Sequence, residues 1–330
     1  MASAPSALSF SSETSISART PQTGVLFRPC NPPKRPRPYE FRTPTINTGS
    51  LSHANGSAVV RTGDTAVVCG VRAEILRASD IPHPYTAEAG SRELEELGLL
   101  VPNLELSTGC SPAHLPGNPP STQAQSLSQR ILSLLHVSKL VNVDDLRVRY
   151  QPPPTDDETP DEPPPVVTKA YWTLYMDIWV IGLDGNAFDA AWAAAIAALR
   201  DVKLPKAWWD ADREAVVCSD AFSESRQLTL NGLPVASTFA VFSNSNSTLG
   251  PRKEPESWVL ADPDEFEEEL CNETVTVVVT PQRNGSKGGI LKIEKSGGGV
   301  VGKERLRDLV DRAEDRWSDW ERVLMQENTG

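Results

Sequence analysis

The feature that most constrains the fold is one continuous stretch, MDIWVIGLDGNAFDAAWAAAIAAL, which runs from Met176 to Leu199. Apolar residues alternate along its first part, and this alternation predicts a β-strand over residues 168–183. Asp184 and Gly185 then form a turn, and an alanine-rich helix is predicted to begin at Asn186. Because the free amides at a helix start attract anions, this turn is also a candidate phosphate site.

Three segments have apolar residues at helical spacing. In the helix that begins at Asn186, the apolar stripe is predicted to pack in the core, and its members are Phe188, Trp192, Ile196 and Leu199. A second helix is predicted to start at Ser121, a good N-cap residue, and to cover a sheet face with Leu127, Ile131, Leu134 and Leu135. The third lies near the C-terminus, with apolar residues at i, i+3 and i+4 spacing from Leu306 to Leu324.

The remaining regular elements are predicted to be strands. A hairpin is predicted at 57–74, because Gly63 and Asp64 suit its turn. Further runs have strand character, namely DLRVRY, EAVVCSD, ASTFAVF, SWVLADP, TVTVVVT and GILKIEK. The segment 83–120 is expected to be mostly loop with an acidic surface. Since strands are followed by helices twice along the chain, the pattern favours an α+β fold of two similar halves over a doubly wound parallel sheet.

Proline-rich and polar segments divide the chain. The 330 residues include 28 Pro, so much of the chain must be loop. Residues 1–38 are predicted to be a disordered tail, and the proline and acid run at 151–166 is predicted to be an exposed, flexible insert. We therefore expect one domain at 39–203, which carries the insert, and a second at 204–330, which ends in the C-terminal helix.

Charge and cysteine content exclude several classes of protein. With 32 Lys and Arg against 44 Asp and Glu, the net charge of −12 argues against a free-standing nucleic-acid binder. The five cysteines are far apart and include no C-x-x-C pair, so neither a disulfide framework nor a zinc site is expected. No run approaches about 18 consecutive apolar residues, so no membrane-spanning helix is expected.

Five segments together resemble one family. They are GSAVVRTGDTAVVCGV, MDIWVIGLDGNAFDAAWAAAIAAL, VASTFAVF, LADPDEFEEELCNETVTVVV and KSGGGVVGKERLRDLVDRA. Their order and spacing, over about residues 39–327, are similar to those of the RNase PH family of phosphorolytic exoribonucleases. The best match is the branch that forms the ring of the eukaryotic RNA exosome, and within it the ribosomal RNA-processing protein 43 type. The resemblance implies an RNase PH-like fold with two related halves of sheet and helix.

The resemblance also implies a reaction, in which inorganic phosphate attacks the terminal phosphodiester of an RNA 3′ end. That reaction needs cations or dipoles for the phosphate, and carboxylates for a metal ion or for protons. Active members carry the motif D-x-D-x4-D-G-G-T-R at the start of a helix, where Thr and Arg hold phosphate. Asp177, Asp184 and Gly185 match this motif, whereas the residues that depart from it are Trp179, Asn186, Ala187 and Phe188. Phe188 stands where the motif has its arginine, so only the helix dipole and amides remain to attract an anion.

Two further parts of the implied site also lack the side chains that the reaction requires. Active members place a second phosphate-binding arginine in the loop before the first helix, but no Lys or Arg lies between Arg92 and Arg130. His114 is not expected to substitute, because a histidine is largely uncharged at neutral pH. The carboxylate motif E-D-x5-D reads Glu268-Glu269 and then Val275, which can neither bind a metal nor move a proton. We therefore predict the fold without the reaction, and no catalytic, cofactor-binding or metal-binding residue.

The role implied by the resemblance is structural. The chain would form one segment of a hexameric ring, beside other RNase PH-like subunits and under cap proteins, and RNA would pass through the pore to a separate nuclease. Processing of ribosomal RNA and decay of mRNA would follow, in the nucleus, nucleolus and cytoplasm. Arg61 and Arg72 are candidates for guiding RNA, and they are equally interpretable as ordinary charges on a strand.

Two alternatives remain open at this stage. One is an active phosphate-dependent exoribonuclease whose site is completed by a partner across a heterodimer interface. The other is a two-domain α+β protein that binds some other ligand.

Overall fold

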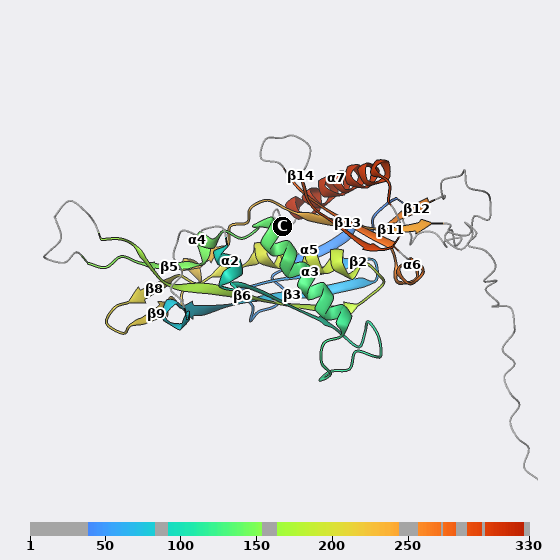
Figure 1. Ribbon diagram of the computed structural model, residues 1–330. Coiled ribbons are helices and arrows are strands. Elements are labelled where there is room, and N and C mark those ends of the chain that lie inside the picture. Colours follow the sequence, from blue (N-terminus) through green and yellow to red (C-terminus); the bar gives the residue numbers. More distant parts are fainter. Residues whose placement is uncertain are drawn as a thin grey trace, which may run out of the picture.

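The computed structural model describes residues 39–82, 92–153, 164–243, 257–271, 273–281, 289–298 and 301–326. The predicted tail at 1–38 and residues 154–163 of the predicted insert lie outside this part of the chain. The described part is elongated and contains two principal β-sheets with helices packed against them (Figure 1). None of its helices is both long and apolar enough to cross a membrane.

The larger sheet has six strands in the order β1-β2-β3-β6-β4, and β5 also pairs with β6. Its strands are β1 (Pro44–Thr48), β2 (Gly56–Thr62), β3 (Thr65–Arg77), β4 (Leu100–Leu106), β5 (Arg147–Tyr150) and β6 (Val167–Gly182). The hairpin predicted at 57–74 is confirmed as β2 and β3, and the strand predicted at 168–183 is confirmed as β6.

The expectation that residues 83–120 are mostly loop is wrong for part of this segment. After the short helix α2 (Glu93–Glu96), residues 100–106 form β4, which runs parallel to β6. Pro102 conceals this strand in the sequence, because proline lacks the N–H group that a central strand needs. β4 lies at the end of the strand order, where the loss of that donor is tolerated.

The smaller sheet is antiparallel, in the order β12-β11-β13-β14. Its strands are β11 (Val235–Ser243), β12 (Ser257–Ala261), β13 (Glu273–Thr280) and β14 (Gly289–Gly297), with α6 (Glu265–Leu270) between β12 and β13. The predicted C-terminal helix is confirmed as α7 (Lys303–Gln326), which packs against β11 and β13. Leu309 and Ala313 of α7 are fully buried in the core beneath it. The side chain of Leu324 is outside the described residues.

Two long helices pack on the larger sheet. α3 (Thr122–Ser138) contacts β4, and α5 (Ala187–Asp201) contacts β2 and β3. Ser121 caps α3 as predicted, since its Oγ accepts a hydrogen bond from the Ala124 amide at 3.2 Å. The apolar residues predicted for the core of these helices are all buried, namely Leu127, Ile131, Leu134 and Leu135 of α3 and Phe188, Trp192, Ile196 and Leu199 of α5.

α5 is buried on every side rather than along one stripe. All of its residues from 187 to 199 are buried, because the helix also contacts β11 of the smaller sheet. In Figure 1 it lies between the two sheets, behind α3. Eight small alanines allow both sheets to approach it closely, and they stand at 187, 190, 191, 193, 194, 195, 197 and 198.

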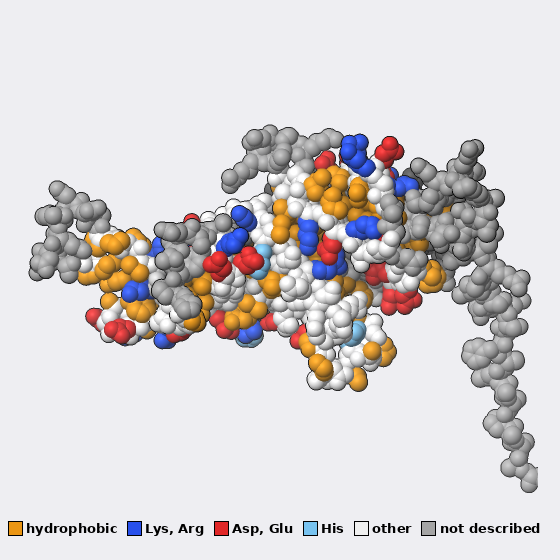
Figure 2. Space-filling model, viewed as in Figure 1, with side chains coloured by type: hydrophobic (Ala, Val, Ile, Leu, Met, Phe, Trp, Pro, Cys, Tyr) orange, Lys and Arg blue, Asp and Glu red, His pale blue; other side chains and the backbone are white. Residues whose placement is uncertain are grey.

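Short elements complete the described chain. They are α4 (Val143–Leu146), the 3-10 helices η1 (Ala78–Asp80) and η3 (Phe222–Glu224), the pair β7 (Lys203–Leu204) and β10 (Arg226–Gln227), and the pair β8 (Ala207–Asp210) and β9 (Ala215–Cys218). The predicted domain boundary between 203 and 204 falls within β7, and the division into two domains stays a prediction. On the face shown in Figure 2, basic and acidic side chains are interspersed rather than gathered into one basic stripe.

Candidate functional site

The turn between β6 and α5 is tightly enclosed by the smaller sheet. Gly185 and Asn186 both have left-handed backbone conformations, with φ of 72° and 51°. A Cβ atom at Gly185 would overlap the backbone of Pro263 and Asp264, which connect β12 to α6. Glycine is therefore required both by the dihedral angle and by the close approach. Asn186, a residue type that tolerates this conformation, is the N-cap of α5.

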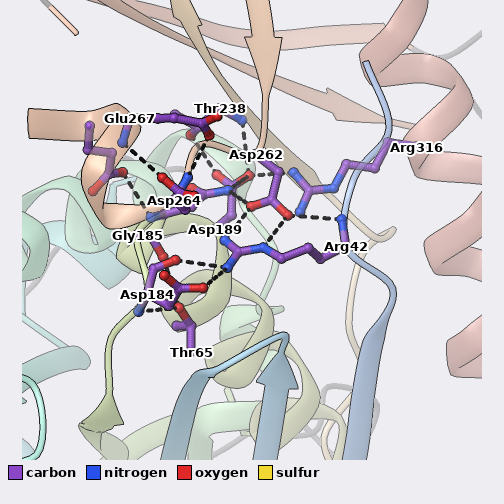
Figure 3. A network of polar contacts seen from close by, with 12 residues as sticks. Arg42, Thr65, Asp184, Gly185, Asp189, Thr238, Asp262, Asp264, Glu267 and Arg316 are labelled. Atoms are coloured by element: carbon purple, nitrogen blue, oxygen red, sulfur yellow. Dashed lines mark hydrogen bonds and ion pairs between the residues drawn. The ribbon is translucent and has the colours of Figure 1, made fainter. Parts of the chain in front are cut away.

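The amino end of α5 is occupied by the protein's own carboxylates (Figure 3). The Asn186 amide donates a hydrogen bond to Oε1 of Glu268 at 2.8 Å. The Asn186 side chain donates from Nδ2 to Asp189 at 3.0 Å and to Asp262 at 2.6 Å. Glu268 thus takes a backbone donor at the helix start where an anion from solution would bind, with Asp189 and Asp262 close beside it.

Arg42 connects the segment before β1 to both sides of this turn. It pairs with Asp262 through two parallel contacts, from Nε at 2.8 Å and from Nη2 at 2.9 Å, and its backbone amide donates to the same carboxylate at 2.9 Å. Its Nη1 donates to the carbonyl oxygen of Asp184 at 2.8 Å. Burial alone would raise the pKa of Asp262, but the bonds from Arg42, the charge of Arg316 and the Asn186 amide group hold it below its ordinary value.

Asp189, in the first turn of α5, is the buried centre of the network. Its carboxylate pairs with Nη1 of Arg316 from α7 and accepts hydrogen bonds from the Thr238 amide at 3.0 Å and hydroxyl at 2.7 Å. Both charged side chains of the pair are almost fully buried. Arg316 also donates to the carbonyl oxygen of Ala236 at 2.9 Å. The pair therefore fixes α5, β11 and α7 relative to one another.

Glu268 has an unusual protonation equilibrium for a glutamate. Burial raises its pKa to about 7, and the neighbouring charges of Asp189 and Asp262 act in the same direction. The hydrogen bond from the Asn186 amide and the charge of Arg42 oppose this rise without cancelling it. The amino end of α5 thus already contains more carboxylates than it can stabilise in their charged form.

Phe188, which stands at the position of the motif's arginine, is buried and lies beneath a different cation. The guanidinium of Arg130, from α3, lies 3.9 Å from the centre of the Phe188 ring. Its Nη2 donates to the Thr276 hydroxyl at 3.2 Å, and its Nε lies 3.1 Å from Oε1 of Glu294. Arg130 is therefore already paired with an acid. The sequence analysis used Arg130 only as the end of a segment without cations, and this tertiary pairing leaves no local signal.

The carboxylate position assigned to Val275 does not face this site. Val275 is fully buried in the core beneath α7. Side chains alternate along a strand, so the next residue, Thr276, faces the α5 side and lies 3.0 Å from the Thr238 hydroxyl. Glu268 does belong to the site, whereas Glu269 is exposed. The assignment of Val275 to this site is thus corrected, and the polar side chain at this point of β13 is Thr276.

The other candidate residues lie on the larger sheet or its loops. Arg61 and Arg72 are exposed and paired, with Asp64 at 3.5 Å and with Asp177 at 3.4 Å. His114 lies in the loop before α3. Within the described residues, no group of three or more His, Cys, Asp and Glu side chains is arranged to hold a metal ion.

The residues that build the network were largely missed by the sequence analysis. They are Arg42, Asp189, Thr238, Asp262 and Arg316. One local signal was available, because Asp264 and Glu267 form a capping box that marks the start of α6, between Asp262 and Glu268 in the sequence. The other contacts join residues far apart in the sequence.

Comparison with models of known protein families identifies the family of this chain. The RNase PH model, described as the 3′ exoribonuclease family, domain 1, matches residues 40–205, half of the chain. The chain belongs to the RNase PH family. The predicted RNase PH-like α+β fold is thereby confirmed.

Individual members of the RNase PH family are similar over most of their length. The chain is 36% identical to the exosome complex component rrp43 of Schizosaccharomyces pombe over 278 residues, 84% of each protein. It is 27% identical to the exosome complex component Rrp42 of Methanothermobacter thermautotrophicus, over 84% of this chain and 83% of that one. A solved structure of the Archaeoglobus fulgidus exosome, with RNA bound to the active site, matches with a TM-score of 0.57 and 26% identity, over 84% of this chain and 86% of that one.

Proposed function

We propose that this chain is a non-catalytic structural subunit of the RNA exosome ring. The observation that carries the proposal is the amino end of α5, where Glu268 accepts the hydrogen bond of the Asn186 backbone amide and Asp189 and Asp262 accept those of the Asn186 side chain. The similarity to proteins named exosome complex components, over more than four fifths of the chain, supports the assignment to that assembly.

Electrostatics oppose phosphate binding at this position. Two like unit charges about 4 Å apart near a protein surface repel each other by roughly 4 kcal/mol, whereas a helix terminus contributes at most about 2 kcal/mol of attraction. Phosphate would meet Asp184 and the partly charged Glu268, while the charges of Arg42 and Arg316 are already matched by Asp262 and Asp189. The carboxylates therefore oppose the attraction of the helix, and the two arginines of the network do not add to it.

In this proposal the chain acts through its shape and its contacts. It joins other RNase PH-like subunits and cap proteins around a pore, through which RNA passes to a separate nuclease for 3′–5′ processing and degradation. Maturation of ribosomal RNA and decay of mRNA, in the nucleus, nucleolus and cytoplasm, are the corresponding processes. The negative net charge suits a subunit whose surface meets mainly proteins.

The test compares complete rings assembled with the wild-type chain and with Asp184→Ala. Each ring is incubated with 3′-labelled RNA and inorganic phosphate, and the release of nucleoside diphosphates is measured. We expect equal rates in the two rings, within about twofold. Asp212→Ala, at an exposed aspartate in the turn between β8 and β9 and outside the motif, is the matched control for assembly. Release that disappears with Asp184→Ala but not with Asp212→Ala would establish the active, heterodimer-completed exoribonuclease instead.

A further inference from the structure

A groove lies between the open face of the larger sheet and the loop before α3. It has a volume of about 600 Å³ and is lined by Glu105 of β4, Trp179 of β6 and the loop residues from Ala113 to Ser121. This loop projects from the lower edge of the molecule in Figure 1, and it is largely white and orange in Figure 2. The groove lies apart from the network at the start of α5 described above.

The loop that forms the groove is held firmly at its base. The Ser107 hydroxyl donates to the carbonyl oxygen of Ile181 at 2.8 Å and accepts from the Gly109 amide at 3.1 Å. The Cys110 thiol donates to the carbonyl oxygen of Val180 at 3.1 Å. A Cβ atom at Gly109 would overlap the Ile181 carbonyl oxygen, so the loop sits directly against β6. The groove is therefore formed before any partner binds, which lowers the entropic cost of binding.

The floor of the groove combines an exposed indole with a carboxylate. Trp179 is 55% exposed, an unusual state for the largest side chain on a sheet. Glu105 is its direct partner in the parallel register of β4 and β6, and it is exposed as well. A guanidinium group can stack on an indole while its N–H donors bind a carboxylate, so the pair suits an arginine.

The rest of the lining indicates a protein partner. Leu115, which is 59% exposed, and three prolines provide apolar surface beside the pair. Among the residues that line the groove, none is Lys or Arg. A nucleic acid would need cations for its phosphates, and here it would meet Glu105 instead.

We propose that this groove receives an arginine-bearing segment of an adjacent RNase PH-like subunit, with the guanidinium between Trp179 and Glu105. The apolar residues that flank that arginine contact Leu115 and the prolines. The inference rests on the proposed function, because it requires the chain to stand beside such a subunit. Charge complementarity favours a basic side chain as the occupant, because Glu105 is the one carboxylate in the lining and no Lys or Arg accompanies it there.

The test uses the full-length chain, titrated into the co-expressed remaining subunits of the ring. Trp179→Ala and Glu105→Lys are each expected to weaken incorporation by about tenfold, and the loss from Glu105→Lys is expected to shrink as salt rises from about 0.1 M to about 0.5 M. The matched controls are Trp208→Ala, at a tryptophan that is 43% exposed on β8, and Glu96→Lys, at an exposed glutamate of α2. Both controls are expected to incorporate like the wild type. All four side chains are exposed, and thermal unfolding of each variant verifies that its fold is intact.

A cross-linking experiment identifies the occupant directly. A photoreactive benzoylphenylalanine replaces Leu115, and the assembled ring is irradiated in the presence of RNA. We expect an adduct with a peptide of a neighbouring subunit that contains arginine. Cross-links to RNA alone, or variants that incorporate like the controls, would overturn the groove proposal while the ring itself remains. A wild-type chain that does not enter the ring would overturn both the proposed function and the groove.

Discussion

The guanidinium of Arg130 lies 3.9 Å from the centre of the Phe188 ring, so a cation from α3 covers the residue that replaces the motif's arginine. Phe188 is buried, and Arg130 is paired with Glu294. The position of the motif's arginine is therefore filled by a stack of two side chains. An arginine in place of Phe188 would bury a second positive charge beside Arg130, whose acidic partner is Glu294.

Phe188→Arg is accordingly expected to destabilise the chain by roughly 3–5 kcal/mol, because it buries an unpaired charge beside Arg130. Phe188→Leu keeps an apolar side chain but leaves a small cavity and removes the ring beneath Arg130, and it is expected to cost less, on the order of 1–2 kcal/mol. Urea unfolding of both variants measures the difference. Phosphorolysis gained by Phe188→Arg would contradict the electrostatic argument above.

Gly185→Ala is expected to lower the free energy of unfolding by roughly 3 kcal/mol or more, because strain and overlap add at this position. Gly117 has a similarly positive φ of 86°, but a Cβ atom there would meet nothing within 4 Å. Gly117→Ala should thus cost only the dihedral strain, about 1–2 kcal/mol. Chemical denaturation measures the loss in free energy of unfolding for each variant. The difference between the two losses is the cost of the overlap with the Pro263 and Asp264 backbone. Equal losses would show that this contact contributes nothing.

Asp189→Asn tests the buried pair with Arg316. Removal of one partner leaves an uncompensated buried charge, so we expect a loss of about 3–5 kcal/mol in stability. Arg322, which pairs with Asp319 on the exposed face of α7, provides the control, and Arg322→Ala is expected to change stability by less than about 1 kcal/mol. Thermal unfolding at fixed ionic strength measures the loss of stability in each of the two variants. A small effect of Asp189→Asn would mean that the pair is not what holds the two sheets together.

Glu268 predicts a pH dependence of stability. Its pKa is about 7 in the folded chain and near its ordinary 4.5 when unfolded, so the folded state binds the proton more tightly. The contribution of Glu268 to the free energy of unfolding is fully present below about pH 4.5 and is lost as pH rises through about 7.

Glu268→Gln keeps an acceptor for the Asn186 amide and removes the titration. We expect the wild type to lose stability relative to this variant by on the order of 1–2 kcal/mol between pH 5 and pH 8. Unfolding curves of both proteins at several pH values measure this difference. Parallel pH profiles would show that Glu268 is not responsible.

Local patterns predicted the elements well where a single periodicity dominates. The strand and helix around Asp184-Gly185 and the cap at Ser121 were found because each depends on neighbours in sequence. β4 was missed because Pro102 reads as a strand breaker, although an edge position tolerates it.

The site was less predictable than the fold. The sequence indicated the loss of phosphate-binding side chains, but not what replaced them. Arg42 reaches Asp262 across 220 positions, and Arg130 reaches Phe188 from another helix. Such pairs depend on the tertiary arrangement, and no periodicity encodes them. The exposed Trp179 was likewise visible only as a departure from a motif.

The position of α5 between the two sheets has a consequence for synthesis of the chain. A nascent polypeptide that ends after Asp201 contains the helix and the larger sheet, but not β11 or α7. The face of the alanine-rich helix α5 that contacts β11 in the complete chain would then be exposed to water. Asp189 would lack its ion-pair partner Arg316. We therefore expect a chain that ends at Asp201 to expose apolar surface until the second half is made, and to be more prone to aggregation and proteolysis than the full chain.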